Sequence, residues 1–319
     1  MLNSTLFSQK ETSILFIGNS FTFMNDMPFI FRDMALSKGK KVIVDTVVEG
    51  GKSFKFHSEQ KETYEKIKER NWDYVFIQGH SNELAQPEVK VDIETFPYAK
   101  KITDSIRLNS ACTQIVLYMT WGYKNGNPKW SVIANYDSMQ YRIKNQYFRF
   151  ADLLDARISP VGEVWKSIRN AHSGINLYDA DLQHPSLAGS YLAACTHFAS
   201  IFGESPIGNK VNVDLNPNVR SIIEFNASQI VLNNLNQWRF VNKEYDLQAN
   251  FDVIIKGNEV NFINRSVGFL KCKWDFGNDS TSTEDNPKHV FLEKGRYLIQ
   301  LQIENFCKSL EISREILIE

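Results

Sequence analysis

The stretch SILFIGNSFT, residues 13–22, places an apolar run directly before a glycine, an asparagine and a serine. A short apolar run that ends in a turn signal is typical of a buried strand in a parallel sheet. Four further runs of this kind follow, at residues 41–48, 72–78, 114–119 and 156–161. Helical patterns lie between several of them. Short apolar strands that alternate with helices predict an α/β fold whose parallel sheet is covered on both faces.

Four helical segments are predicted around these strands. Residues 58–70 are charged with sparse apolar positions, which indicates a solvent-facing helix, and residues 136–154 carry apolar side chains at a spacing of three to four. A third helix follows Pro185-Ser186 and ends near Phe202, with Gly203 as its expected C-cap. A fourth starts at Pro217, a residue favoured in the first helical turn, and runs to about Leu235.

The pattern of apolar and polar residues changes after about Trp238, where the helical periodicity ends and the alternation typical of strands begins. Residues 297–304, YLIQLQIE, are apolar on one face and largely polar on the other, as in a half-buried antiparallel strand. Turn signals recur at 257–258, 277–278 and 294–295. This spacing predicts a small all-β sandwich. The boundary falls between Phe240 and Gln248, which gives predicted domains over residues 1–241 and 247–319.

Composition excludes several classes of protein. The chain has 319 residues and a net charge of −1, so it lacks the basic excess of a nucleic-acid-binding protein. No apolar run approaches the roughly 18 residues that span a bilayer. Residues 1–12 are polar and lack the apolar core of a signal peptide. The protein is therefore expected to be either intracellular or a form from which a leader has been removed.

The four cysteines are Cys112, Cys195, Cys272 and Cys307. None belongs to a CxxC pair, which argues against a zinc site. Cys195 lies in an apolar helical stretch and is expected to be a buried thiol. Cys272 and Cys307 share the C-terminal region and could pair.

Candidate functional residues follow several of the predicted strands. Ser20 follows the first strand, Gly50-Gly51 the second, and Gln78 ends the third, whereas Asp181 and His184 lie in the loop after the fifth. The carboxyl ends of parallel strands meet at one edge of a sheet, where ligands bind. We therefore expect these residues to converge.

Their chemistry is that of nucleophilic catalysis. Ser20 needs a base, and His184 needs a carboxylate such as Asp181 to hold its tautomer. The backbone N–H groups of Ser20 and of Gly50 or Gly51, together with the Gln78 amide, are candidate donors to an oxyanion. The alternative for Ser20 is that it only caps the following helix. The alternative for the two glycines is an ordinary turn. We expect no metal and no organic cofactor.

These residues resemble the SGNH (GDSL-type) hydrolase superfamily. Its four blocks contribute a serine, a glycine, an asparagine or glutamine, and an Asp-x-x-His. They map here to residues 18–20, to Gly50 or Gly51, to Gln78 and to residues 181–184.

The resemblance covers roughly residues 13–208 and is carried by FIGNSFT at 16–22, WDYV at 72–75, MTW at 119–121 and HPSxxGSY at 184–191. These stretches are closest to an uncharacterised bacterial branch of the superfamily. It implies a flavodoxin-like three-layer sandwich with a five-stranded parallel sheet. It also implies hydrolysis of esters, often of acetyl groups on carbohydrates.

The third block departs from the common Gly-x-Asn-Asp, because this chain reads QGHSN from Gln78 to Asn82. Some carbohydrate esterases of the superfamily have Gln-Gly-x-Ser here, which favours Gln78 as the oxyanion donor and leaves Asn82 as its competitor. His57 and His80 lie on the same predicted edge of the sheet, so each is either a structural residue or a substrate contact. Trp121 follows the fourth strand and forms either a pocket wall or part of the core.

The C-terminal segment resembles a PKD domain, an immunoglobulin-like sandwich common in bacterial extracellular proteins. The resemblance covers residues 248–319 and rests on VxFxNxS at 260–266, WDFG at 274–277, NPxH at 286–289 and GxYxIxL at 295–301. It implies a spacer or binding module and a periplasmic, secreted or surface location. Trp274 is expected in the sandwich core, and His289 is expected to be structural.

The sequence thus predicts a serine esterase acting on an acylated small molecule or glycan, most simply an O-acetyl carbohydrate. Two alternatives remain open. An acyltransferase would use the same three residues with a sugar as acceptor, and a glycan-binding or surface-binding protein would use the α/β fold only as a scaffold.

Overall fold

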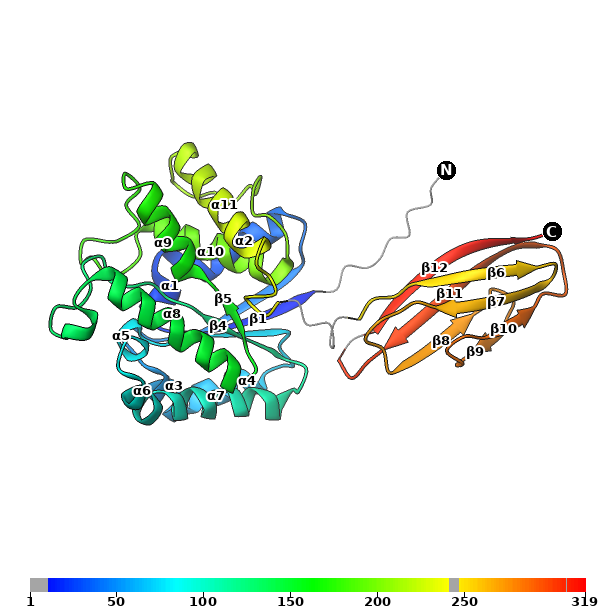
Figure 1. Cartoon of the computed structure of the whole chain (residues 1–319), viewed down its shortest axis with the longest axis horizontal. Helices are drawn as coiled ribbons and strands as arrows, with labels where there is room; N and C mark the ends of the chain where they lie inside the picture. Colours follow the sequence, from blue (N-terminus) through cyan, green and yellow to red (C-terminus); the bar gives the residue numbers. More distant parts are fainter. Residues whose placement is uncertain (1–10, 241–246, 308) are drawn as a thin grey trace. The chain divides into compact units, whose positions relative to one another are not determined.

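The computed structural model describes residues 11–240, 247–307 and 309–319. The chain divides into two compact units, residues 1–240 and 241–319 (Figure 1). The first combines helices and strands, whereas the second contains strands and turns in its described part. Within the described residues, no helix combines the length and apolar character needed to cross a membrane.

The first unit is built on a five-stranded parallel sheet of order β2-β1-β3-β4-β5. The strands are β1 (Thr12–Gly18), β2 (Val42–Val48), β3 (Tyr74–Ile77), β4 (Gln114–Tyr118) and β5 (Arg157–Ser159). The predicted α/β fold class is confirmed. The fifth strand is shorter than expected because Pro160, which follows it, is the N-cap of the next helix.

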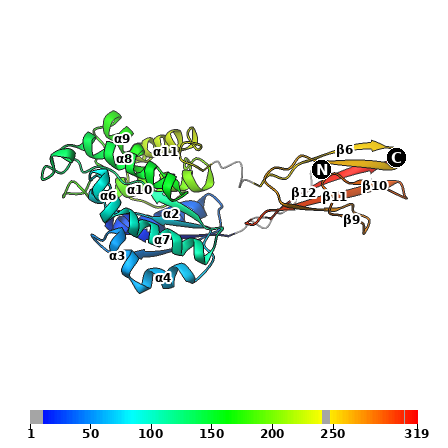
Figure 2. The same ribbon diagram turned by 60° about the horizontal axis from the view of Figure 1, so that its bottom comes forward.

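Helices cover both faces of this sheet. They are α1 (Ser20–Phe23), η1 (Met24–Asp26), α2 (Met27–Ser37), α3 (Phe54–Glu59), α4 (Lys61–Lys68), α5 (Ser81–Leu84), α6 (Glu88–Glu94), α7 (Phe96–Asn109), η2 (Ser131–Ile133), α8 (Tyr136–Leu153), α9 (Val161–Ala171), α10 (Leu187–Phe202) and α11 (Pro217–Leu232). Figures 1 and 2 show α2, α10 and α11 on one face and α3, α4 and α7 on the other.

One predicted helix is present but shorter than expected. The helix expected over residues 58–70 is α4, which begins only at Lys61 because Gln60 has an extended backbone conformation, and residues 58–59 are the end of α3. The helix over residues 136–154 and those starting after Ser186 and at Pro217 are confirmed, and Gly203 ends α10 with the expected left-handed φ of 60°.

His197 on α10 lies in the aromatic core above the sheet. It is 0% exposed, and its ring lies 4.7 Å from that of Phe76 and 4.3 Å from that of Tyr118. Its Nδ1 lies 2.7 Å from the Ser159 hydroxyl, while its Nε2 has no hydrogen-bond partner among the described residues. Burial lowers the pKa of His197 to about 3, so the ring is neutral in the folded protein.

We expect His197 to make the protein less stable in mild acid. Its pKa falls from the ordinary 6.5 to about 3 on folding, so below pH 6.5 the unfolded chain binds a proton that the folded protein does not. This difference lowers the free energy of unfolding by about 2 kcal/mol between pH 8 and pH 5. His197→Gln should lose that share of the pH dependence in urea titrations.

Histidines 57, 80 and 289 also have lowered pKa values and remain in both proteins, so the comparison isolates His197. Parallel stability curves for the two proteins would contradict the prediction.

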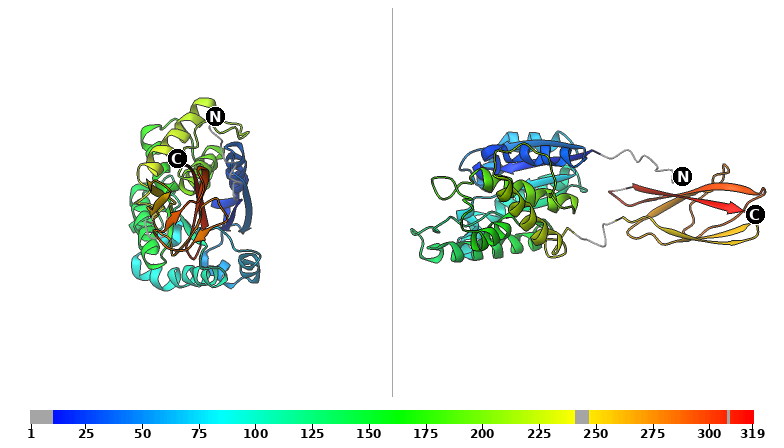
Figure 3. Two further views of the ribbon diagram at one scale, coloured as in Figure 1. Left: turned by 90° about the vertical axis from the view of Figure 1, so that its right-hand side faces the viewer. Right: turned by 90° about the horizontal axis from the view of Figure 1, so that it is seen from above.

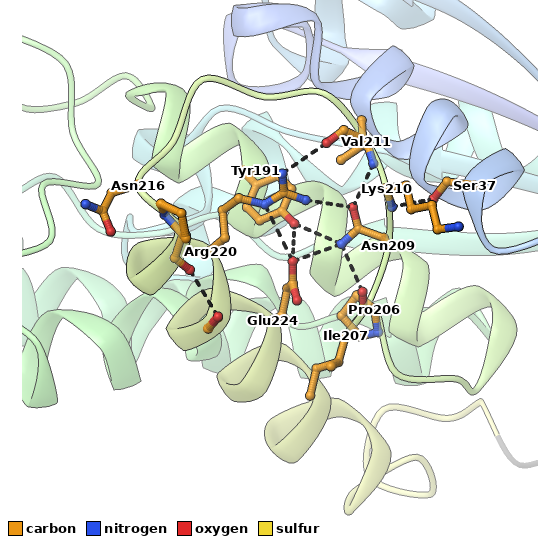
Figure 4. A network of polar contacts seen from close by, with 12 residues as sticks. Ser37, Tyr191, Pro206, Ile207, Asn209, Lys210, Val211, Asn216, Arg220 and Glu224 are labelled. Atoms are coloured by element: carbon orange, nitrogen blue, oxygen red, sulfur yellow. Dashed lines mark hydrogen bonds and ion pairs between the residues drawn. The ribbon is translucent and has the colours of Figure 1, made fainter.

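A buried polar network joins α10 to α11 (Figure 4). The Tyr191 hydroxyl donates to Glu224 Oε1 at 2.5 Å, and Asn209 Nδ2 donates to both groups at 2.9 and 3.0 Å. Arg220 donates to Asn209 Oδ1 at 3.2 Å. Because its buried members are hydrogen-bonded to one another, the network fixes the helix that directly follows His184.

The second unit consists of two antiparallel sheets (Figure 3). Their orders are β10-β7-β6 and β12-β11-β8-β9, formed by β6 (Phe251–Lys256), β7 (Glu259–Asn264), β8 (Lys271–Asp275), β9 (Thr281–Ser282), β10 (Lys288–Val290), β11 (Gly295–Glu304) and β12 (Ser309–Ile318). The predicted all-β sandwich is confirmed.

The core of this unit contains the predicted aromatic residue. Trp274 is 0% exposed and packs against Phe251 and Phe262, with ring centroids 5.2 and 5.3 Å away. His289 stacks on Phe276 at 4.3 Å, in keeping with a structural role. Cys272 is a buried free thiol, so the suggested pairing with Cys307 is wrong. Cys195, in the first unit, is likewise a buried free thiol, as predicted.

Candidate active site

Ser20 is the first residue of α1, directly beyond the carboxyl end of β1. The side chain of Asn19 caps this helix by accepting the Phe21 N–H at 3.1 Å. The capping role considered for Ser20 therefore belongs to Asn19, and the Ser20 hydroxyl has another partner. Ser20 Oγ lies 2.7 Å from Nε2 of His184.

His184 in turn contacts Asp181. Nδ1 of His184 forms a short hydrogen bond with Oδ2 of Asp181. The Ser20 residue is 8% exposed, whereas the side chains of His184 and Asp181 are 32% and 45% exposed. The structure thus brings together the three residues that the sequence selected, in the order hydroxyl, imidazole, carboxylate. In this arrangement the imidazole can accept the hydroxyl proton, and the carboxylate can stabilise the resulting imidazolium.

A tight hairpin holds the carboxylate and the imidazole together. Oδ1 of Asp181 accepts the backbone N–H groups of Gln183 and His184, both at 2.9 Å, and Leu182, which follows Asp181, has a left-handed φ of 63°. The backbone N–H of Asp179 closes the hairpin on the carbonyl of His184 at 2.8 Å. Burial raises the pKa of Asp181, but its hydrogen bonds to His184 and to the two backbone groups lower that pKa below the usual value.

An aromatic stack supports this hairpin. Trp121 lies parallel to Phe21 at 4.7 Å and to Trp165 at 3.9 Å, and the Phe21 ring meets the His184 ring edge-on at 5.3 Å. Nε1 of Trp121 donates to the Gln183 carbonyl at 3.0 Å. Trp121 is 0% exposed, so it belongs to the core and not to a pocket wall. Its indole N–H nevertheless fixes the hairpin.

The predicted glycines lie in a turn beside the serine segment. The Glu49 N–H donates to the Gly18 carbonyl at 3.1 Å, and the Asn19 side chain donates to the Lys52 carbonyl at 2.9 Å. Both Gly50 and Gly51 are exposed, and Gly51 has a φ of 68° that favours glycine. The turn is thus tied to the Ser20 loop, and its backbone is accessible.

Gln78 supports the serine loop from the interior. Its Oε1 accepts the Asn19 N–H at 2.8 Å and the Thr22 hydroxyl at 2.9 Å, and its Nε2 donates to the Gly79 carbonyl at 2.6 Å. A backbone N–H can only donate, so the Asn19 contact fixes which end of the amide is the oxygen. Gln78 is 1% exposed. These contacts favour a supporting role over the oxyanion role expected for its amide.

Asn82, the competitor, is half-buried at the start of α5. Its Oδ1 accepts a hydrogen bond from Asn127 at 3.2 Å, and its amide also interacts with the Tyr123 hydroxyl. Asn82 is thus held by two neighbours, and it is more accessible than Gln78.

The two additional histidines differ in position. His57 is 1% exposed and donates from Nε2 to the Gly18 carbonyl at 2.9 Å, so it supports the end of β1 and does not line a pocket. His80 is half-buried, caps α5 and lies beside Phe21. Burial lowers the pKa of both residues, and the nearby charge of His184 lowers that of His80 further.

Asn25 was not selected from the sequence. Its backbone is left-handed, with a φ of 54°, and its Nδ2 donates to the Pro185 carbonyl at 3.1 Å and to the Ser190 hydroxyl at 2.9 Å. The Ser190 hydroxyl donates back to the Met24 carbonyl at 3.0 Å. This residue therefore joins the segment after Ser20 to the segment after His184. The Asn-Asp pair at 25–26, whose residue types tolerate left-handed backbone, was the available signal.

Comparisons with known proteins agree with this architecture. Residues 250–311 match the PKD domain family model. A comparison with curated proteins found no match. A DUF4886 family protein from Bacteroides uniformis has a similar structure, with a TM-score of 0.61 and 20% identity over 70% of this chain and 95% of that chain.

Two further solved structures match smaller parts of the chain. A candidate SGNH hydrolase from Slackia heliotrinireducens is 25% identical, with a TM-score of 0.48, over 59% of this chain and 98% of that chain. The PKD1 domain of the Vibrio cholerae metalloprotease PrtV is 27% identical, with a TM-score of 0.23, over 23% of this chain and 96% of that chain. The first unit shares its fold with the Bacteroides protein, and the family-model match of residues 250–311 confirms the predicted PKD resemblance of the second unit.

Proposed function

We propose that this protein is a serine ester hydrolase. The observation that carries the proposal is the continuous contact from Ser20 Oγ through the His184 ring to the Asp181 carboxylate. Ser20 attacks the ester carbonyl while His184 takes the hydroxyl proton, and the protonated His184 returns that proton to the leaving alcohol. A water molecule then gives its proton to His184 and attacks the acyl-enzyme, which releases the acid and restores Ser20.

The oxyanion of each tetrahedral intermediate needs converging donors. We assign the backbone N–H of Ser20 and one N–H of the Gly50-Gly51 turn, which hydrogen bonds tie to the same loop. For the side-chain donor we favour Asn82, because Gln78 is 1% exposed and supports the serine loop, whereas Asn82 is more accessible.

Two resemblances support the proposed substrate class. The sequence resemblance to carbohydrate esterases supports an O-acetyl group on a glycan. The match of residues 250–311 to the PKD domain supports a location outside the cytoplasm, where glycans are accessible.

A panel of p-nitrophenyl esters tests the proposal. We expect turnover of acetate to exceed that of butyrate and octanoate, because acetyl is the proposed acyl group. A preference for octanoate would indicate that the esterase is a lipase and not a deacetylase. No turnover of any of the three would contradict the esterase proposal.

We expect Asn25→Ala to lower kcat roughly 10- to 100-fold with little change in KM. The amide of Asn25 holds the two catalytic segments together without reaching the reacting atoms, and small displacements of catalytic groups are costly. Steady-state kinetics on p-nitrophenyl acetate would show it. Asn25→Gly removes the same amide but tolerates the left-handed backbone without strain. It therefore separates loss of the amide from backbone strain as the cause of a lower kcat. An unchanged kcat in both variants would exclude the positioning role.

A further inference from the structure

A pocket of about 510 Å³ adjoins the hairpin that carries the catalytic acid and base. Lys124, the end of α9 and residues 173–178 line it. Its volume lies within the range of small-molecule sites, roughly 300–1,000 Å³. Ser20, Asp181 and His184 do not line it, so it is distinct from the catalytic trio.

The pocket is positively charged and polar. Lys124 and Arg169 contribute two cations, and no acidic residue of the described chain lines the pocket. Neither cation forms an ion pair with a carboxylate in the described ranges. Asn170, Ser173 and Asn176 add neutral hydrogen-bonding groups. Such a lining suits a compact anion that also carries hydroxyl groups.

One of the two cations is held in place by a neighbouring ring, and the other is fixed through its main chain. The Arg169 guanidinium lies over the Tyr136 ring, 4.2 Å from its centroid, and the residue is half-buried. The backbone N–H of Lys124 donates to the Leu182 carbonyl at 2.9 Å. Because the guanidinium of Arg169 is ordered before a ligand binds, its pairing with an anion would cost less side-chain entropy.

The pocket wall is continuous with the catalytic hairpin. Tyr178 pairs with Pro185, and the Ser186 N–H donates to the Leu177 carbonyl at 2.9 Å. The Ser186 hydroxyl donates to the Asn176 carbonyl at 2.8 Å. A group bound in the pocket would therefore lie against the segment that presents His184.

We propose that this pocket binds the carboxylate of an acidic sugar in the acylated substrate, with Lys124 and Arg169 as its cationic partners. A guanidinium pairs with a carboxylate through two parallel hydrogen bonds, and the neighbouring amides and hydroxyl match sugar hydroxyls. The substrate role rests on the proposed esterase function, whereas the binding of the anion does not.

Binding of free sugars to the full chain tests the pocket without turnover. Calorimetric titration should show that glucuronate binds and that glucose binds at least about tenfold more weakly. Lys124→Gln and Arg169→Gln should each weaken glucuronate binding roughly tenfold or more. Lys129→Gln removes an exposed charge from the same loop outside the pocket and should change nothing. Should Arg169→Gln fail to fold, Arg169→Lys retains the charge and should retain part of the affinity.

Two results would overturn the assignment of the pocket. Glucuronate binding that is absent, or that is equal in wild type and both Gln variants, excludes the anion site. Tighter binding of glucose 6-phosphate than of glucuronate, dependent on the same two residues, excludes a carboxylate as its ligand.

Matched substrates then test the role in catalysis. The acetylated methyl glycoside of glucuronate should have a KM roughly tenfold or more below that of the acetylated methyl glucoside, and Lys124→Gln should remove the difference. Turnover of the neutral ester tests the esterase activity itself. If the neutral ester is turned over and the acidic ester is not preferred, only the proposed role of the pocket is overturned. Turnover of neither ester, together with inactive p-nitrophenyl esters, would overturn the proposed function and leave the binding result to stand or fall separately.

Discussion

Ser20→Ala should lower kcat for p-nitrophenyl acetate by roughly 10⁴-fold or more. The variant keeps the fold but removes the only atom that we assign as nucleophile, and no other hydroxyl is hydrogen-bonded to His184 Nε2 in the described chain. The residual rate would come from the oxyanion donors and from substrate binding alone. Steady-state rates at saturating ester, corrected for spontaneous hydrolysis, give the comparison.

A matched serine distinguishes loss of chemistry from loss of structure. Ser221 is exposed on α11, where its hydroxyl donates to the Pro217 carbonyl, so Ser221→Ala makes the same chemical change far along the chain. It should retain wild-type kcat, and both variants should unfold within about 1 kcal/mol of wild type. A Ser20→Ala rate near that of wild type would eliminate the proposed mechanism.

Asp181→Asn should lower kcat roughly 10³- to 10⁴-fold. The carboxylate accepts the Nδ1–H of His184, which leaves Nε2 free to take the serine proton. An asparagine amide can donate toward Nδ1 instead, which favours the tautomer whose Nε2 already carries a proton. The histidine then remains in place but cannot act as a base, so KM should change far less than kcat.

Asp179→Asn is the control for this substitution. Asp179 lies in the same hairpin, and its side chain accepts the Ala180 N–H at 2.7 Å, whereas its contact with His184 is made by backbone atoms. The control should stay within about threefold of the wild-type kcat, since a surface substitution of this kind changes stability little. Equal losses in the two variants would show that the hairpin fold, and not the carboxylate at 181, governs the rate.

Much of the fold could be read from the sequence because its strands are short apolar runs bounded by glycine or proline. All five predicted strands of the first unit are present, and the change to alternating residues after about Trp238 correctly indicated an all-β fold for the C-terminal part. The start of α4 was predicted three residues too early because nothing in the residue types marks Gln60, whose extended backbone separates α3 from α4.

In the candidate site, the chemistry of the residues could be predicted from the sequence but their burial could not. The sequence analysis could identify Ser20, Asp181 and His184 because a nucleophile, a base and an acid are needed together and occur here in the expected chain order. Burial was not accessible in the same way: Trp121, Gln78 and His57 follow strands just as pocket residues do, yet each is at most 1% exposed. The sheet edge has an interior layer as well as a surface, and only packing decides which layer a side chain joins.

Asn25 was not identified as a candidate site residue for a different reason. Its function as a positioning residue depends on a left-handed backbone and on two partners about 160 residues later in the chain. A single sequence reports the tolerance of asparagine for that backbone but not the identity of distant hydrogen-bond partners.

Covalent labelling of the nucleophile tests the central claim most directly. Wild type would be treated with a fluorophosphonate, a reagent that phosphonylates activated serines, digested and sequenced by mass spectrometry. The structure predicts one adduct, on Ser20, that forms at least about 100-fold more slowly in His184→Ala because the base is missing. An adduct on another residue, or labelling of Ser20 at the same rate without His184, would contradict a catalytic serine activated by His184.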